Sequence, residues 1–138
     1  MSDPLHQLEL LLRRVWREDD LEGALADLPQ DFEWLVPGFP GSQATRGPDA
    51  TLEFFRDWID QWEDLRVDWE LEQSDPDTVF AIVDMRGRGR ASGVPVELRF
   101  AQVWSFREGV PVRMVFHGDV EEGRSAAGLA PPPAPPEP

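Results

Sequence analysis

One stretch decides the fold of this chain: Thr78–Leu129, TVFAIVDMRGRGRASGVPVELRFAQVWSFREGVPVRMVFHGDVEEGRSAAGL. It predicts three long strands, 79–90, 94–106 and 110–119, which are joined by two tight turns and followed by a short helix. Large apolar side chains alternate with charged ones along all three strands. One face of the sheet must therefore be buried against other elements of the chain.

The segments upstream supply the cover for this face. Helical spacing of apolar residues predicts one helix that starts at Pro4, one at 20–28 and one at 48–62. Strands are expected at 31–36 and at 65–71. We expect an α+β fold: a cone-shaped barrel of a curved antiparallel meander sheet, wrapped by about three N-terminal helices, with a short C-terminal helix.

Length and composition predict one domain. The 138 residues are 41% hydrophobic, which is enough for a single core in residues 1–129. The proline-rich tail 130–138 is expected to be disordered. No run approaches the length of a membrane span and no signal peptide is visible, so we expect a cytoplasmic protein.

The charge and the missing residue types exclude several functions. A net charge of -14 repels a phosphate backbone, so nucleic acid is not an expected partner. The chain has no Cys, Tyr or Lys, which excludes thiol nucleophiles, disulfides and Schiff-base lysines. With two separate His and no Cys, we expect no metal site and no cofactor.

The predicted register brings large side chains together on one concave face. Turns at Ser92-Gly93 and at 107–109 would place Gln102 opposite Val83 and Met114. Gln102 is the only polar residue in this group, so it either orients a ligand or is a buried glutamine satisfied by backbone or water. Together with the helix 48–62, this face predicts a pocket for a small apolar molecule. The residues expected to line it are Trp34, Trp58, Met85, Phe100, Gln102, Met114 and Phe116.

The opposite sheet face is charged, with an apolar group at its centre. Such a group on a charged face predicts an interface, here a homodimer through the outer sheet face. The residues expected at its centre are Ile82, Ala101, Val103 and Val115.

Several motifs stand out along the chain: Trp34 after an acidic strand start, Arg46-Gly47-Pro48-Asp49-Ala50, the segments 87–93 and 103–109, and Asp119 ahead of 126–129. These motifs resemble those of SnoaL-like proteins, which belong to the nuclear transport factor 2-like superfamily together with ketosteroid isomerases. The resemblance spans about residues 5 to 129. It implies a cone with a deep pocket, often in a homodimer, in a family of cyclases, isomerases, dehydratases, epoxide hydrolases and non-catalytic binders.

The resemblance does not imply a complete set of catalytic residues in this chain. In SnoaL-type cyclases and similar epoxide hydrolases, a catalytic Asp lies three residues before a second acidic position. Asp119 resembles that second position, which places Phe116 where the catalytic Asp would be. An Arg and Asp pair of the epoxide hydrolases is replaced by Val83 and Met85. The tyrosine of ketosteroid isomerases has no counterpart, because the chain has no Tyr.

The sequence therefore favours binding of a small, mostly apolar molecule without a recognisable catalytic set. One alternative is an isomerase, polyketide cyclase or epoxide hydrolase-like enzyme that uses an Asp/His pair, with Asp119 or Glu33 beside His117. Strand parity turns His117 away from the pocket, although a register slip of one residue would reverse this. Asp119 is expected to cap the helix that follows it. The other alternative is a dimeric scaffold with a filled pocket.

Overall fold

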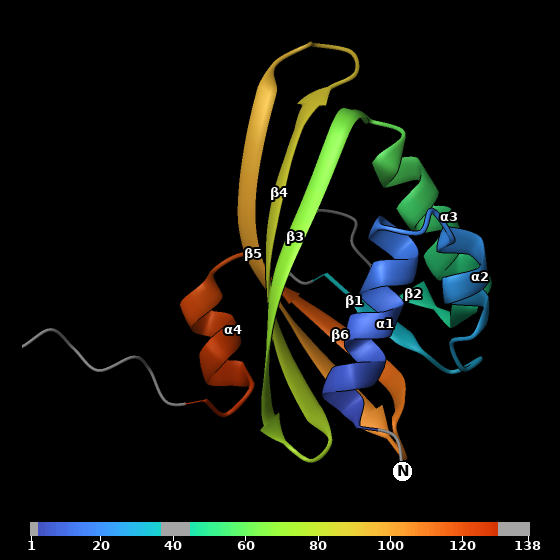
Figure 1. Ribbon diagram of the computed structural model, residues 1–138, viewed down its shortest axis with the longest axis vertical. Coiled ribbons are helices and arrows are strands. Elements are labelled where there is room, and N and C mark those ends of the chain that lie inside the picture. The colour runs from blue at the N-terminus through green and yellow to red at the C-terminus, as the bar shows by residue number, and fades with distance from the viewer. Residues whose placement is uncertain (1–2, 37–44, 130–138) are drawn as a thin grey trace, which may run out of the picture.

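The computed structural model describes residues 3–36 and 45–129, which form one six-stranded sheet with helices on both faces (Figure 1). The strands lie in the order β2-β1-β6-β5-β4-β3. In chain order, the elements are α1 (Pro4–Trp16), α2 (Leu21–Ala26), β1 (Glu33–Leu35), β2 (Thr45–Arg46), α3 (Gly47–Ile59), β3 (Trp62–Asp75), β4 (Thr78–Gly89), β5 (Pro95–Arg107), β6 (Val110–His117) and α4 (Val120–Ala126).

The sheet confirms the α+β prediction with two corrections. Strands β3 to β6 form the expected antiparallel meander, but β1 pairs with β6 in parallel. The two outermost strands, β2 and β3, do not pair with each other, so the sheet is curved and open and is not a closed barrel. The short strand β2, which the sequence did not reveal, pairs with β1 at its outer edge.

The helices begin where the sequence predicts. Asp3 caps α1, since its side chain accepts a hydrogen bond from the backbone N–H of Leu5, and Pro4 occupies the first turn. At α3, Gly47 has a φ of 84°, which favours glycine, and Pro48 follows it. Asp119 caps α4 by accepting from the backbone N–H of Glu121, as expected.

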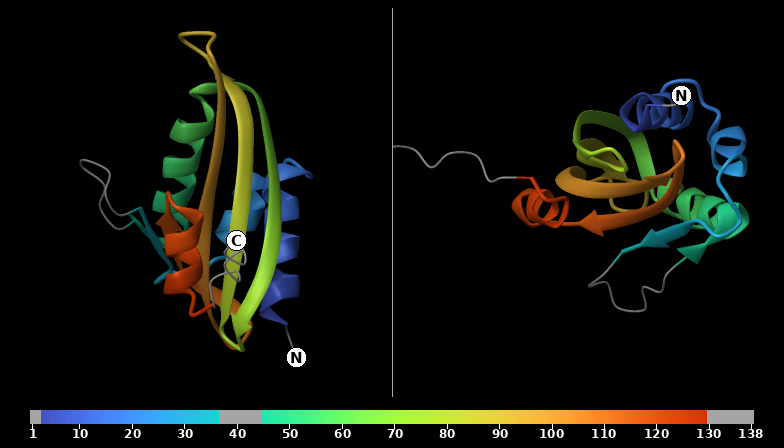
Figure 2. Two further views of the ribbon diagram at one scale, coloured as in Figure 1. Left: turned by 90° about the vertical axis from the view of Figure 1, so that its left-hand side faces the viewer. Right: turned by 90° about the horizontal axis from the view of Figure 1, so that it is seen from below.

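The helices divide between the two faces of the sheet. Helices α1, α2 and α3 lie against the concave face, and α4 lies against the opposite face (Figures 1 and 2). The main core lies on the concave side, where Leu8, Phe32 and Met114 are fully buried. This arrangement leaves room for a cavity between the three helices and the sheet.

The apolar group on the outer face is covered within the chain. Ile82, Ala101 and Val103 are buried in a second small core with Phe80 and Ala127, beneath α4. Val115 is half-buried. An apolar group left uncovered was the reason to expect a dimer through this face, and for Ile82, Ala101 and Val103 that reason was wrong, because α4 and the residues after it cover them. Whether the chain forms a dimer stays a prediction.

The register differs from the prediction by two residues in both hairpins. Gln102 pairs with Ala81 on β4 and with Phe116 on β6, in place of Val83 and Met114. In the first hairpin, β4 ends at Gly89 and β5 begins at Pro95, so the loop is longer than a two-residue turn. An even shift preserves the face of every side chain, so the concave face has the predicted composition.

Three further predictions concern membrane spans, metal sites and the C-terminal tail. No helix within residues 3–36 and 45–129 is long and apolar enough to cross a membrane. Within the same ranges, no group of three His, Cys, Asp or Glu could hold a metal ion. The predicted disordered tail 130–138 lies outside the described residues.

Candidate ligand-binding cavity

A cavity of about 530 Å³ lies between the concave sheet face and the helices α1, α2 and α3. Its size falls within the range of about 300–1,000 Å³ that is typical of small-molecule sites. Of the lining side chains that the structure describes, only those of Arg99 and Gln102 are neither apolar nor aromatic. Phe54 and Leu98 line the cavity and are each 40% exposed, so they mark its opening.

Six of the seven predicted pocket residues line this cavity, and Met114 does not. Met114 is fully buried, and its register partners are Trp104 on β5 and Trp34 on β1. Its expected position in the pocket was therefore wrong. That the others bind a ligand stays a prediction; they are Trp34, Trp58, Met85, Phe100, Gln102 and Phe116.

Helix α1 and strand β3 also line the cavity, which the sequence did not predict. On α1, Leu11, Val15 and Trp16 line the cavity, because they flank the buried stripe of Leu8 and Leu12. On β3, Val67 and Trp69 alternate inward. The sequence predicts a strand over 65–71, but it does not indicate which helix the strand faces.

Aromatic rings hold one side of the cavity in place. Trp34 packs edge-on against Phe55, with ring centroids 4.7 Å apart, and against Trp104 at 6.0 Å. Phe100 and Phe116 pack at 4.9 Å on neighbouring strands. Trp104 belongs to the core, Phe55 packs against it, and both also line the cavity. The cavity surface is thus an extension of the core.

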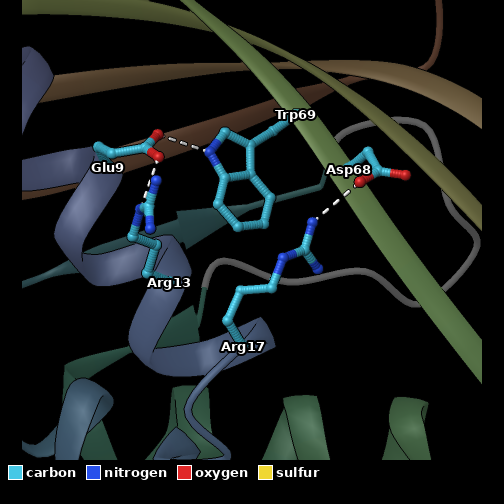
Figure 3. A network of polar contacts seen from close by, with 5 residues as sticks. All are labelled: Glu9, Arg13, Arg17, Asp68 and Trp69. Carbon is cyan, nitrogen blue, oxygen red and sulfur yellow. Dashed lines mark hydrogen bonds and ion pairs between the residues drawn. The ribbon is translucent and has the colours of Figure 1, made fainter.

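A polar network fixes Trp69 from outside the cavity (Figure 3). The indole N–H of Trp69 donates to Glu9 Oε2 at 2.7 Å, and Arg13 donates to the other carboxylate oxygen at 2.9 Å. The hydrogen bond from Trp69 lowers the pKa of Glu9 below 4.5; burial opposes this and Arg13 adds to it. Arg17 lies over the Trp69 ring at 4.6 Å and also pairs with Asp68.

Gln102 is the polar group at the cavity wall. It is 8% exposed, and its Oε1 accepts a hydrogen bond of 3.0 Å from the indole N–H of Trp104. Among the described residues, its Nε2 amide has no hydrogen-bond partner. The other polar lining residue, Arg99, directs its guanidinium to Asp84 at 3.0 Å on the outer face. The cavity wall therefore carries the amide donor of Gln102 among apolar and aromatic side chains, of which Trp34 also has a buried indole N–H with no hydrogen-bond partner among the described residues.

The candidate acids and bases do not meet at the cavity. Among the residues that the structure describes, no Asp, Glu or His lines it. Asp119 caps α4, Glu33 pairs with Arg46 at 3.5 Å, and His117 extends from the outer face of β6 opposite Ala101. Phe116, in the place that the resemblance gives to a catalytic Asp, lines the cavity instead. The described site lacks a general base.

The fold agrees with the comparisons with known proteins. Residues 9–125 match the family model of the SnoaL-like domain. The chain belongs to the SnoaL-like domain family. A search among curated proteins finds no match.

Solved structures confirm the fold of this SnoaL-like chain. An NTF2-like protein from Burkholderia thailandensis is 23% identical with a TM-score of 0.75, over 94% of this chain and 100% of its own. Rv0760c from Mycobacterium tuberculosis, in complex with estradiol-17β-hemisuccinate, is 22% identical with a TM-score of 0.70, over 88% and 97%. TerC, co-crystallised with polyporic acid, is 20% identical with a TM-score of 0.72, over 92% and 99%.

Proposed function

We propose that this SnoaL-like protein binds a small, mostly apolar molecule in its cavity and does not catalyse a reaction on it. The observation that carries the proposal is a cavity of about 530 Å³ lined by apolar and aromatic side chains. Burial of apolar surface would drive binding, at roughly 25 cal/mol per Å² removed from water. The open cavity disfavours the alternative of a scaffold with a filled pocket.

The fold neighbours support a ligand of this size and character. One of them was crystallised with a steroid derivative and another with polyporic acid. Both molecules are ligands of the neighbouring proteins. For this chain, they support only the proposal that the ligand has an apolar ring system. The enzyme alternative lacks support at the site, since the described lining contains no carboxylate and no imidazole.

Nile red, a neutral dye that fluoresces in apolar surroundings, tests the binding proposal. We expect saturable binding with one dye per chain. Val83→Trp should weaken it by about tenfold, because overpacking a site costs on the order of 1–3 kcal/mol. Val83 lines the cavity from β4. Arg86→Trp is the matched control, because it adds the same ring to an exposed position of the same strand.

Two results would contradict the proposal. Equal dye binding by the wild type, Val83→Trp and Arg86→Trp would show that the cavity is not the site. Turnover of a ketosteroid, polyketide or epoxide substrate that His117→Ala or Asp119→Asn abolishes would show that the protein is an enzyme.

A further inference from the structure

We infer that the cavity selects apolar ligands that carry a neutral hydrogen-bond acceptor, such as a carbonyl oxygen, and that the Nε2 amide of Gln102 binds this acceptor. The inference rests on the proposed function and defines the chemistry of its ligand. It depends on the orientation of one amide group, which the neighbouring side chains determine.

Trp104 fixes the orientation of the Gln102 amide. An indole N–H can only donate a hydrogen bond, so the atom of Gln102 that lies 3.0 Å from it must be the acceptor Oε1. Trp104 itself is 2% exposed and packs against Phe32 and Trp34, so it cannot turn away. The amide therefore directs its donor group, and not its acceptor, toward a ligand.

The free donor makes the cavity selective. Both N–H groups of Nε2 lack a partner among the described residues, and Gln102 lines the cavity. A ligand with an acceptor at this point satisfies the amide. A pure hydrocarbon that fills the cavity leaves the amide desolvated and unpaired, which lowers its affinity. A ligand with only a donor at this point meets another donor.

The charges favour a neutral acceptor over a carboxylate. The only cationic residue in the described lining is Arg99, and its guanidinium is already paired with Asp84. The chain as a whole carries a net charge of -14, which repels anions. Ketones, quinones, esters and ethers on an apolar ring system fit these conditions.

Fluorene and 9-fluorenone test this inference, since they share a planar ring system and differ by one carbonyl oxygen. Their dissociation constants are measured by calorimetry on the full chain for the wild type, Gln102→Met and Gln102→Glu. Gln102→Met keeps the size of the side chain and removes the amide. Gln102→Glu keeps an acceptor for Trp104 but replaces the Nε2 donor by oxygen.

We expect the wild type to prefer fluorenone to fluorene, and both variants to reduce that preference by about 2- to 10-fold, the value of one hydrogen bond. Fluorene should bind Gln102→Met at least as well as it binds the wild type. Circular dichroism shows whether each variant folds. If Gln102→Met does not fold, the wild type is compared with Gln102→Glu alone.

The outcomes separate this inference from the proposed function. An equal preference in the wild type and the folded variants would overturn the inference and leave the binding function intact. A wild type that binds Nile red but does not bind fluorenone would also overturn the inference and leave the binding function intact. A wild type that binds neither Nile red nor the two probes overturns the proposed function, and the inference with it.

Discussion

Gln102 on β5 and Phe116 on β6 are direct partners in the sheet, and both side chains line the cavity. The amide donor therefore lies beside an aromatic ring, which itself packs against Phe100 at 4.9 Å. The sequence resemblance predicts that position 116 corresponds to the catalytic Asp of SnoaL-type cyclases and similar epoxide hydrolases. Here a ring takes that place, which makes this corner of the cavity suited to binding and unsuited to proton transfer.

Replacing Phe116 by Asp should put an ionisable group into this corner. Phe116 is half-buried, and desolvation should raise the pKa of the new carboxyl above its ordinary value, by less than the ~3–5 units of full burial. Loss of the ring should cost about 3 kcal/mol of stability. Since the folded pKa is raised, the stability of the variant should fall as the pH rises through that pKa.

Phe116→Asn is the matched control, because it has the shape of Asp without the charge. Urea unfolding of the two variants between pH ~4 and pH ~8 gives the comparison. Two parallel stability curves would contradict the prediction, since they would mean that the carboxyl at position 116 remains fully solvated.

The Glu9 network should contribute to stability in a defined pH window. The folded pKa of Glu9 is lowered by the hydrogen bond from Trp69, so its contribution is complete well above the ordinary pKa of a glutamate and is lost as the pH falls through the folded pKa. Glu9→Gln should cost about 1 kcal/mol at neutral pH, because the pair is partly exposed. The difference between wild type and variant should shrink toward zero in acid, as measured by urea unfolding. A difference that is independent of pH would contradict this assignment.

The sequence predicts the concave face of this fold well, and the reason is the period of a strand. Side chains alternate with a period of two, so the two-residue register error in both hairpins left every inward residue inward. What changed is the set of direct neighbours. Gln102 lies beside Phe116, and Met114 lies beside Trp104, where it is buried away from the cavity.

The register errors come from backbone details that residue types indicate weakly. In the second hairpin, Glu108 and Gly109 both have positive φ, of 53° and 76°, and form a two-residue turn. A bulge between Ser105 and Phe106 then shifts the pairing by one more residue. The cover of Ile82 and Val103 by α4 was missed for another reason, because a helix of seven residues gives little sign of the face it packs on.

The packing of α4 should depend on Gly123. A Cβ atom at this position would lie 2.5 Å from Ala101 Cβ and 3.2 Å from a ring carbon of Phe80, so α4 would have to shift. Gly123→Ala should therefore lower stability by about 1–3 kcal/mol, although alanine favours a helix. Ser125→Ala, at an exposed position of the same helix, is the control and should be neutral or slightly stabilising.

Loss of the α4 cover should also expose the apolar group around Ile82 and Val103. Light scattering should then give a larger average mass for Gly123→Ala than for the wild type at the same concentration. If Gly123→Ala is as stable as Ser125→Ala and scatters like the wild type, α4 does not protect this face.

Replacing Trp104 by Phe should loosen the selectivity of the cavity. The substitution keeps an aromatic ring in the core and removes the indole N–H that fixes Gln102 Oε1. The amide can then turn either its oxygen or its nitrogen toward the ligand. The preference for fluorenone over fluorene should fall by about twofold or more, and 9-fluorenol, whose hydroxyl can donate, should gain affinity relative to fluorenone.

Trp16→Phe is the matched control, because Trp16 lines the same cavity from α1 and has no part in the Gln102 hydrogen bond. It should leave the ratio of the two affinities unchanged, even if it changes both of them. Urea unfolding should show a loss of about 1–3 kcal/mol for Trp104→Phe, from the hydrogen bond and from the smaller ring. A destabilised Trp104→Phe protein that keeps the wild-type preference for fluorenone would mean that Trp104 only stabilises the core and does not orient the amide of Gln102.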